Sequence, residues 1–272
     1  MNKDRNISVM GILNLTGDSF FAGSRLLRSD GSVDEAGLRA RVEKMLSEGA
    51  DILDLGAVST RPGAETVSEA EEWRRLAPAL ALLRQEFPAA RFSVDTTRSS
   101  IAARTFDLAG PFLVNDISAG EDDPEMLRTA ARLGLGYVAM HKRGMPASMQ
   151  SLTDYPEGVV AAVQAYFRQF SLRAEEAGLR DWILDPGFGF AKTVEQNYEL
   201  LGTLGSFRVF GKPILVGVSR KSMIWRPLGI TPEQALPATQ VVHLKALQEG
   251  ADILRVHDVA EAVRTVELFR KV

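Results

Sequence analysis

Glu48-Gly49-Ala50-Asp51-Ile52-Leu53 joins a glycine that can end a helix to an apolar run that can begin a strand. The same six residue types return as Glu249-Gly250-Ala251-Asp252-Ile253-Leu254, near the other end of the chain. A single repeat is weak evidence for a repeated fold. It nevertheless defines a pattern to search for, in which a helix stops, an apolar strand begins and a polar cluster follows.

Eight short apolar runs follow one another along the chain, and each ends in polar residues. The runs are Val9–Leu13, Asp51–Leu55, Arg91–Val94, Phe112–Val114, Gly136–Met140, Trp182–Leu184, Pro213–Val216 and Asp252–Leu254. Consecutive runs leave room for a helix between them, so the chain contains eight predicted strand–helix units. This alternation predicts an α/β fold, a single (β/α)8 TIM barrel domain over residues 1–272, since such barrels usually have about 250 residues.

Helices are predicted between the runs from apolar periodicity, acidic first turns and terminal glycines. They cover Val33–Glu48, Ser68–Phe87, Arg98–Ala109, Pro124–Leu133, Pro156–Gly178, Thr193–Leu204, Thr231–Glu249 and Val259–Phe269. The loops after the first and second strands, 14–32 and 56–68, are long and rich in Gly, Ser, Thr and Arg. Long loops over a barrel mouth often act as lids and substrate clamps, with tolerated insertions as the alternative.

The composition excludes several classes of protein. Apolar residues make up 45% and charged residues 25% of the chain, which is ordinary for a globular domain. The net charge of −3 gives no reason to expect a nucleic acid or an anionic membrane as partner. There is no cysteine, so disulfides and thiolate metal sites are excluded, and a reducing compartment fits. No apolar stretch approaches the roughly 20 residues of a spanning helix, and we expect a cytoplasmic protein.

Polar residues at the ends of three strands indicate a binding pocket. Asp95, Asn115 and Asp185 end the third, fourth and sixth predicted strands, and all C-terminal strand ends of a barrel face one mouth. Two carboxylates and an amide suit a flat heterocycle with ring N–H and amino groups. Each could instead cap a helix, an alternative that stays open for Asp95 and is weaker for Asp185, where Pro186 delays the helix.

Cationic residues at the last two strands indicate an anion site. Arg220 and Lys221 follow the seventh strand, Arg255 and His257 end the eighth, and Arg61 lies in the second long loop. Barrels often bind phosphate near strands seven and eight, so a phosphate or diphosphate is the predicted ligand. The pair Arg220-Lys221 could instead be a solvated pair, and a desolvated Lys221 could form a Schiff base.

Familiar catalytic and metal motifs are missing from the sequence. It has no H-E-x-x-H, no G-x-x-x-x-G-K-[ST], no G-x-G-x-x-G and no G-x-S-x-G. Of the three histidines, His243 lies within a predicted helix and is interpreted as structural. A histidine zinc site is therefore not expected.

The polar clusters together resemble those of the dihydropteroate synthase family. The matching segments are Met10–Phe20, Ser59–Ala64, Val94–Thr96, Asn115–Ser118, Met140–Gly144, Asp185–Phe190, Ser219–Ser222 and Arg255–Val259. They occur in family order and span nearly the whole chain. The resemblance implies a (β/α)8 barrel, usually a homodimer, in folate biosynthesis. Such a transferase joins 6-hydroxymethyl-7,8-dihydropterin diphosphate to 4-aminobenzoate with Mg2+, releases diphosphate, and is a sulfonamide target.

The resemblance also implies a role for individual residues. The implied pterin site is Asp95, Asn115, Asp185, Lys221, Met140 and Arg255; the diphosphate site is Asn14, Arg61, Arg255 and His257; the aminobenzoate site is Phe20, Thr60, Arg61, Pro62, Phe190, Lys221 and Ser222. Asn14 is the implied protein ligand of Mg2+. Asp95, Lys221, Arg255, Asp18 and Arg61 are the implied catalytic residues.

Some residues depart from the family pattern and leave rivals open. Gly17 stands where the family has proline, Val58 stands where an acid usually precedes Ser-Thr-Arg, and a small residue is absent after Ile224. These changes concern the lid loops and the aminobenzoate side. The alternatives are therefore a catalytically impaired pterin-binding paralogue, a folate-dependent methyltransferase barrel and a Schiff-base aldolase using Lys221.

Overall fold

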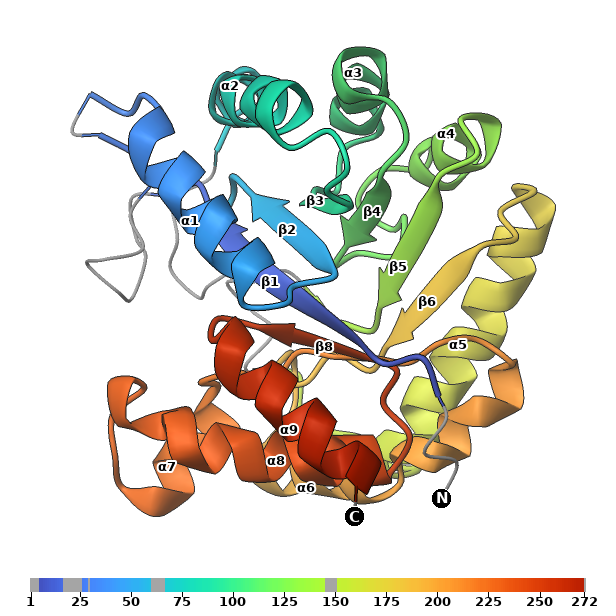
Figure 1. Cartoon of the computed structure of the whole chain (residues 1–272). Coiled ribbons are helices and arrows are strands. Elements are labelled where there is room, and N and C mark those ends of the chain that lie inside the picture. Colours follow the sequence, from blue (N-terminus) through green and yellow to red (C-terminus); the bar gives the residue numbers. More distant parts are fainter. Residues whose placement is uncertain (1–4, 17–25, 29, 60–66, 145–150, 272) are drawn as a thin grey trace.

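The structure is a computed structural model that describes residues 5–16, 26–28, 30–59, 67–144 and 151–271. Eight strands alternate with helices along the chain (Figure 1). The strands are β1 (Ser8–Asn14), β2 (Ile52–Gly56), β3 (Phe92–Asp95), β4 (Leu113–Asp116), β5 (Gly136–Met140), β6 (Trp182–Asp185), β7 (Leu215–Val216) and β8 (Ile253–Val256). All eight runs predicted from the sequence form strands.

The strands form one parallel sheet that curves into a barrel. Their order is β6-β5-β4-β3-β2-β1-β8-β7, and every pair in this series is parallel. An isolated parallel bridge between Leu184 and Ile214 joins β6 to the start of β7 and closes the circle. The predicted (β/α)8 barrel is therefore confirmed.

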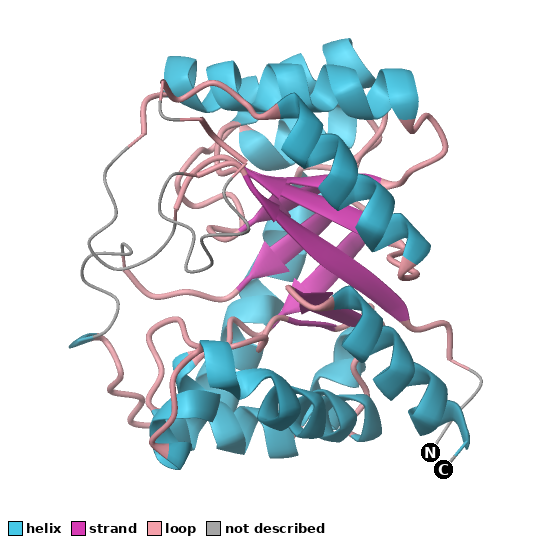
Figure 2. Cartoon of the chain, turned by 60° about the vertical axis from the view of Figure 1, so that its left-hand side comes forward, coloured by secondary structure: helices cyan, strands magenta, loops and turns pink. Residues whose placement is uncertain are grey.

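The helices lie outside the strands (Figure 2). They are α1 (Glu35–Ser47), α2 (Glu69–Glu86), α3 (Ser99–Ala109), α4 (Met126–Arg132), α5 (Val159–Glu176), α6 (Val194–Gly202), α7 (Ser222–Leu228), α8 (Leu236–Gln248) and α9 (Val259–Lys271), with 3-10 turns at Leu204–Phe210 and Glu233–Ala235. Each predicted helix is present within a few residues of its predicted ends. The prediction missed α7, a seven-residue helix whose C-cap, Gly229, has a left-handed conformation.

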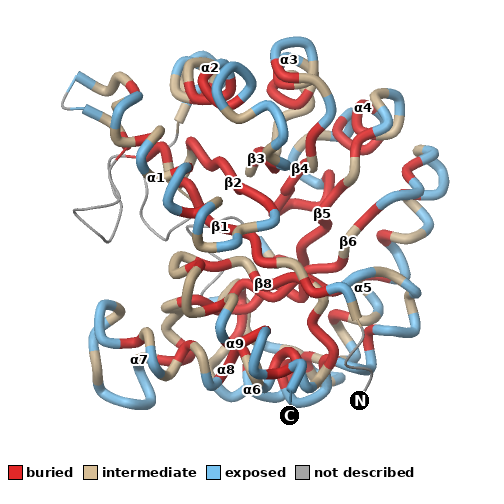
Figure 3. Tube along the Cα trace, viewed as in Figure 1, coloured by how far each residue is buried: buried red, intermediate tan, exposed pale blue. Residues whose placement is uncertain are grey.

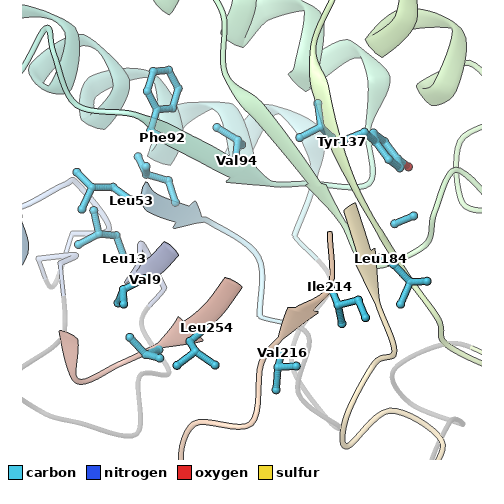
Figure 4. Close-up of a cluster of buried hydrophobic side chains, with 14 of the residues drawn as sticks. Val9, Leu13, Leu53, Phe92, Val94, Tyr137, Leu184, Ile214, Val216 and Leu254 are labelled. Atoms are coloured by element: carbon cyan, nitrogen blue, oxygen red, sulfur yellow. The ribbon is translucent and has the colours of Figure 1, made fainter. Parts of the chain in front are cut away.

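Apolar side chains form two separate layers around the strands. Outward-facing residues of the strands, among them Val9, Leu53, Val94, Leu184 and Leu254, pack toward the helices (Figure 4). A smaller cluster fills the barrel interior and consists of Met10, Ile52, Val138, Leu215 and Ile253, with Leu113 and Ile183 packed against it. Figure 3 shows the result, with buried strands at the centre and helices exposed on their outer sides.

The two copies of the repeated sequence have the same structural role. The carboxylate of Asp51 accepts a hydrogen bond from the backbone N–H of Val9 at 2.7 Å, and that of Asp252 accepts one from Ile214 at 2.9 Å. In each copy an aspartate at the start of a strand thus satisfies an N–H of the preceding strand. The weak sequence repeat therefore reflects a real structural repeat. In the described part of the chain, no helix is long and apolar enough to cross a membrane.

Candidate active site

The polar residues at the barrel mouth form a layer directly above the apolar interior. Strand side chains alternate between the two faces, so a residue two positions after an interior one also points inward. Ile52, Leu113, Val138, Ile183 and Ile253 of the interior cluster are followed two positions later by Asp54, Asn115, Met140, Asp185 and Arg255. Because all strands are parallel, these side chains lie at the same end of the barrel.

Arg255 lies between two carboxylates at this mouth. Its Nε donates to Asp54 at 2.7 Å, and its Nη2 lies 2.6 Å from Asp54 and 3.2 Å from Asp95. Asp54 is fully buried, whereas Asp95 and Arg255 keep 14% and 21% of their side chains exposed. The three residues therefore combine one buried anchor, Asp54, with two groups that a ligand can reach.

Asp54 also receives two neutral donors. Ser93 Oγ donates to its Oδ1 at 2.5 Å, and Asn115 Nδ2 lies 3.2 and 3.3 Å from its two oxygens. Hydrogen bonds to a carboxylate stabilise its charged form. These contacts orient the Asn115 amide as well as Arg255, so Asp54 organises one side of the mouth.

Burial changes the protonation of the groups that remain reachable. Desolvation raises the pKa of Asp95 to about 7, against the opposing effect of the Arg255 cation. Desolvation also lowers the pKa of Lys221 to about 8, although the charge of Asp185 raises it in part. An acid and a base whose pKa values lie this close to neutrality are typical of functional sites.

Asp185 and Lys221 form the opposite side of the mouth. Asp185 Oδ1 accepts a hydrogen bond from the backbone N–H of Gly187 at 2.8 Å. Lys221 Nζ donates to the carbonyl of Phe188 at 2.5 Å and lies 4.8 Å from the centre of the Phe190 ring. The end of β6 therefore carries the carboxylate, and the loop after it carries the aromatic ring and the carbonyl that anchors the lysine.

Asp95 and Asp185 do not act as helix caps. The N-cap residue of α3 is Arg98, and that of α6 is Thr193, whose side chain forms a capping box with Gln196. Asp95 and Asp185 therefore cap neither helix, and both remain at the mouth.

Of the residues predicted to bind an anion after β7 and β8, His257 lies at the mouth and Arg220 does not. His257 lies at the mouth, where its Nδ1 is 3.0 Å from Ser219 Oγ. The prediction that Arg220 faces an anion at the mouth is wrong. Its guanidinium pairs with Asp258 at 2.7 and 2.8 Å and donates to the carbonyls of Pro232 and Glu233, so it ties the loops behind the site together.

The remaining predicted residues are partly described. Asn14 ends β1, Met140 is buried at the end of β5, and Ser222 is the first residue of α7. A Cβ at Gly56 would lie in ordinary van der Waals contact with Asp95 Cβ at 3.5 Å and with Asn14 Oδ1 at 3.8 Å, so Gly56 lies between these two side chains. Asp18, Phe20, Thr60, Arg61 and Pro62, with Gly17, lie outside the described residues.

Two site residues were missed by the sequence reasoning. Asp54 lies within an apolar run, and the signal that could have found it is the repeat itself, which places Asp54 opposite Arg255. Lys192 follows the loop after β6 and is only 4% exposed. A lysine directly before the Thr193 cap resembles an ordinary surface residue, so no sequence signal distinguishes it.

Among the described residues, the mouth offers an oxygen ligand of the kind that Mg2+ uses. No group of three or more His, Cys, Asp or Glu residues that could hold a metal occurs within the described residues. Mg2+ keeps several waters and is commonly bound through one or two protein oxygens plus substrate phosphates. The amide oxygen of Asn14, close to Asp95 around Gly56, is a donor of this kind.

A separate hollow lies at the other end of the barrel. It has a volume of about 940 Å³ and lies below the interior layer, next to Ile52, Leu113 and Ile253. On its rim Arg208 pairs with Asp252 at 3.0 Å. It contains none of the residues predicted for the site.

Comparisons with known proteins agree with this geometry. The model of the family described as "Pterin binding enzyme" matches residues 10–257. The chain is 43% identical over 253 residues to a dihydropteroate synthase of Synechocystis sp., covering 92% of this chain and 85% of the relative. It is 39% identical over 262 residues to the dihydropteroate synthase of Escherichia coli, covering 96% and 89%.

Solved structures show the same relationship. A Yersinia pestis dihydropteroate synthase with a sulfonamide drug complex superposes with a TM-score of 0.89 at 37% identity, covering 100% of this chain and 95% of that one. A Thermus thermophilus dihydropteroate synthase in complex with 4-aminobenzoate superposes with a TM-score of 0.84 at 36% identity, covering 100% and 96%. The chain therefore belongs to the pterin-binding enzyme family and, within it, to the dihydropteroate synthases, which are transferases of folate biosynthesis.

Proposed function

We propose that this chain joins 6-hydroxymethyl-7,8-dihydropterin diphosphate to 4-aminobenzoate and releases 7,8-dihydropteroate and diphosphate. The observation that carries the proposal is the polar layer at the mouth, in which Asp54, Arg255 and Asp95 form one connected group. Facing it are Asp185 and Lys221. Membership of the dihydropteroate synthases supplies the reaction, and this layer supplies the chemistry that the pterin half requires.

The pterin would be held through complementary hydrogen bonds. Its guanidine-like edge carries an amino group and a ring N–H, which donate in parallel to one carboxylate, and Asp185 is the residue that we assign to it. Lys221 has donors for the ring carbonyl, and Asn115 faces the opposite edge. Met140, which is 3% exposed, packs below the ring, and the planar Arg255 guanidinium lies against it.

The diphosphate would lie on the side of Asn14, Arg255 and His257, with Arg61 added from the second loop. Asn14 would hold Mg2+ through its amide oxygen. When bound there, the ion would supply Lewis-acid stabilisation for the negative charge of the leaving diphosphate. Ser219 fixes the orientation of His257, because its Oγ lies 3.0 Å from Nδ1 and 3.3 Å from the backbone nitrogen.

The aminobenzoate would bind beside the loop after β6. Phe190 offers a ring face, and Lys221 Nζ lies 4.8 Å from the centre of that ring. Ser222, at the first turn of α7, offers a hydroxyl and a backbone N–H. Phe20, Thr60, Arg61 and Pro62 would complete this site from the two long loops, and Asp18 would act from the first.

The charges at the mouth favour a dissociative reaction. The carbon–oxygen bond to the diphosphate breaks with its electron pair leaving on the oxygen, and the electron-rich dihydropterin carries the positive charge. Ionised Asp95 stabilises that cation by proximity. The arylamine nitrogen then forms the carbon–nitrogen bond and releases a proton. No strong general base is needed, because an aniline nitrogen is already unprotonated at neutral pH, and positioning provides the remaining acceleration.

Three further properties belong to this proposal. Residues 1–272 would form one domain, the protein would be a cytoplasmic homodimer, and it would be a target of sulfonamides that mimic aminobenzoate. The mass of the protein in sedimentation equilibrium tests the dimer, and fractionation of the source cells tests the location.

A turnover assay with both substrates and Mg2+ tests the reaction. Dihydropteroate and diphosphate should form in equal amounts, and removal of Mg2+ with a chelator should abolish both. Pterin binding without product would instead support the impaired paralogue. Covalent trapping by borohydride on addition of a carbonyl compound, lost in Lys221→Arg, would support the aldolase and contradict the proposal.

A further inference from the structure

Lys192 is a buried amine outside the predicted site. Its side chain is 4% exposed, and Nζ lies 2.9 Å from each of three acceptors: His141 Nδ1, the Gly187 carbonyl and the Phe190 carbonyl. An ammonium group has three protons to donate. The three acceptors therefore match a charged lysine, with His141 as a neutral imidazole whose Nδ1 accepts.

The state of His141 agrees with this arrangement. Burial lowers the pKa of His141 well below its usual range, and the positive charges of Lys192 and Arg143 lower it further. A neutral ring has one acceptor nitrogen, and the position of Lys192 assigns that role to Nδ1. His141 thus serves as an anchor for the lysine at the end of β5.

Lys192 holds the loop that follows Asp185 and carries Phe190. Two of its three acceptors are loop carbonyls, and Lys221 donates to a third loop carbonyl, that of Phe188, at 2.5 Å. The loop is also pressed against β5, since a Cβ at Gly187 would lie 2.0 Å from the carbonyl oxygen of His141. Together the two lysines bind the carbonyls of Gly187, Phe188 and Phe190 and fix the path of the loop between Asp185 and Phe190.

The two lysines also influence the charge of Asp185. Burial raises the pKa of Asp185, and Lys221, Arg255 and Lys192 all act to lower it. Burial lowers the pKa of Lys192 to about 7, and the charge of Asp185 acts in the opposite direction. The ionised form of Asp185 is therefore stabilised by the charges of both lysines, more strongly by Lys221 than by Lys192.

We propose that Lys192 is a positioning residue that holds the loop after β6 in the conformation required by both substrates. Its bonds place Phe190 beside Lys221, and its charge helps to keep Asp185 ionised. The inference rests on the proposed function for the roles of Asp185 and Phe190. The order of the loop itself does not depend on turnover.

The first experiment compares Lys192→Met with Lys142→Met. Lys142 is a matched control because it is also buried and pairs at 2.7 and 2.9 Å with Asp122, which lies outside the loop after β6. The measurements are the KM for each substrate, kcat, and hydrogen–deuterium exchange of peptides covering residues 186–191. Binding of 6-hydroxymethylpterin, followed by its fluorescence, gives a dissociation constant without turnover.

Lys192→Met should raise both KM values and the pterin dissociation constant by about tenfold or more, which corresponds to a loss of about 1.4 kcal/mol. Exchange in the loop should rise as well. Lys142→Met should change each constant by less than about threefold. Unchanged loop exchange and unchanged KM values in Lys192→Met would overturn the inference, as would equal effects in the two variants.

A second pair of variants covers the case in which Lys192→Met does not fold. His141→Leu removes one acceptor, whereas His141→Asn replaces the ring nitrogen with an amide oxygen at a similar position in the side chain. The asparagine variant should restore most of the loop protection that the leucine variant loses. Equal protection in both would contradict the role of the Lys192–His141 contact. Failure of the wild-type protein to make product would refute the proposed function alone, since loop protection and pterin binding compare variants with wild type.

Discussion

Asp54 and Arg255 occupy equivalent positions after the two copies of the repeated sequence, and their side chains form an ion pair with 2.6 Å between Oδ2 and Nη2. They come from β2 and β8, which both pair with β1. The carboxylate is fully buried, whereas the guanidinium remains 21% exposed toward the mouth. The repeat therefore places opposite charges on either side of the first strand, and the arginine that would lie against the pterin is held by a buried anion.

Replacing Asp54 with asparagine should impair pterin binding. Asp54→Asn keeps the shape of the side chain but leaves Arg255 with Asp95 as its remaining carboxylate partner among the described residues. Removal of one member of a buried ion pair lowers the free energy of unfolding by up to about 3–5 kcal/mol, because the remaining charge stays buried without its partner. We expect kcat/KM for the pterin substrate to fall by about 100-fold or more, with a smaller effect on the KM for aminobenzoate.

Ser93→Ala is the matched control for that variant. It removes the hydroxyl that donates to Asp54 at 2.5 Å and leaves both charges in place. Its effect should therefore be near that of one neutral hydrogen bond, about 1 kcal/mol or about fivefold in kcat/KM. Steady-state kinetics with each substrate varied in turn measures both. Equal losses in Ser93→Ala and Asp54→Asn would show that the charge of Asp54 is not what matters.

The activity should depend on pH as a narrow bell. Burial raises the pKa of Asp95 to about 7, and burial lowers the pKa of Lys221 to about 8. The reaction requires Asp95 ionised and both Lys192 and Lys221 protonated, and burial lowers the pKa of Lys192 to about 7. We therefore expect kcat/KM for the pterin substrate to rise as Asp95 ionises through about pH 7 and to fall as the two lysines lose their protons, with the Lys221 step near pH 8. Lys221→Arg keeps its charge and should move the alkaline limb to higher pH. An unmoved alkaline limb in that variant would remove Lys221 from its assigned role.

Much of the fold could be predicted from the sequence because each apolar run contains its own pattern. Ile52-Leu53 or Ile253-Leu254 needs no distant residue to be recognised as a strand. The Ser68 cap was also a local signal, and its side chain accepts from Glu71 at 3.2 Å as such a cap should. By contrast, α7 follows a polar cluster and contains Pro227, so no apolar periodicity marked it.

The gathering of polar residues at the mouth could be predicted most directly where they end a strand. Asp95, Asn115 and Asp185 lie together there because parallel strands bring their ends together. Asp54 lies one step deeper, inside an apolar run, and its partner Arg255 is distant in sequence. Arg220 and Lys221 are adjacent in sequence but differ in their surroundings, because Arg220 forms an ion pair with Asp258 whereas Lys221 lies at the mouth. Such choices depend on tertiary contacts that a single sequence does not contain.

The charge of Asp95 should cost the protein stability. Its pKa in the folded state is about 7, compared with an ordinary value of 3.8. Between these two values the folded protein holds a proton that the unfolded chain has released, so the free energy of unfolding falls as pH rises through this range. The loss above about pH 7 is on the order of a few kcal/mol.

Asp95→Asn should therefore raise the free energy of unfolding at pH 8 and change it little at pH 4, while abolishing most turnover. Urea unfolding at the two pH values tests this, and an equal change at both would contradict the assigned protonation.

Gly187 should not tolerate alanine because its Cβ would collide with backbone. Gly211, which has a similar φ but no close neighbour, separates this effect from backbone strain. The φ of Gly187 is +71°, and a Cβ there would lie 2.0 Å from the backbone oxygen of His141. Gly211 has a similar φ of +63° but no atom within 4 Å of its Cβ position. Gly211→Ala should therefore cost only the backbone strain of a left-handed residue, about 1–2 kcal/mol.

Gly187→Ala adds a collision with backbone that cannot be relieved by a side-chain rotation. We expect it to reduce the free energy of unfolding by about 3 kcal/mol or more, or to push the loop away from His141 and Lys192. In either case the dissociation constant of the pterin should rise, because Asp185 is two residues before the displaced glycine. Urea unfolding and pterin fluorescence on both variants measure the two effects. If the two alanine variants are equally stable and bind pterin equally well, the close approach of Gly187 to β5 is not required for the site.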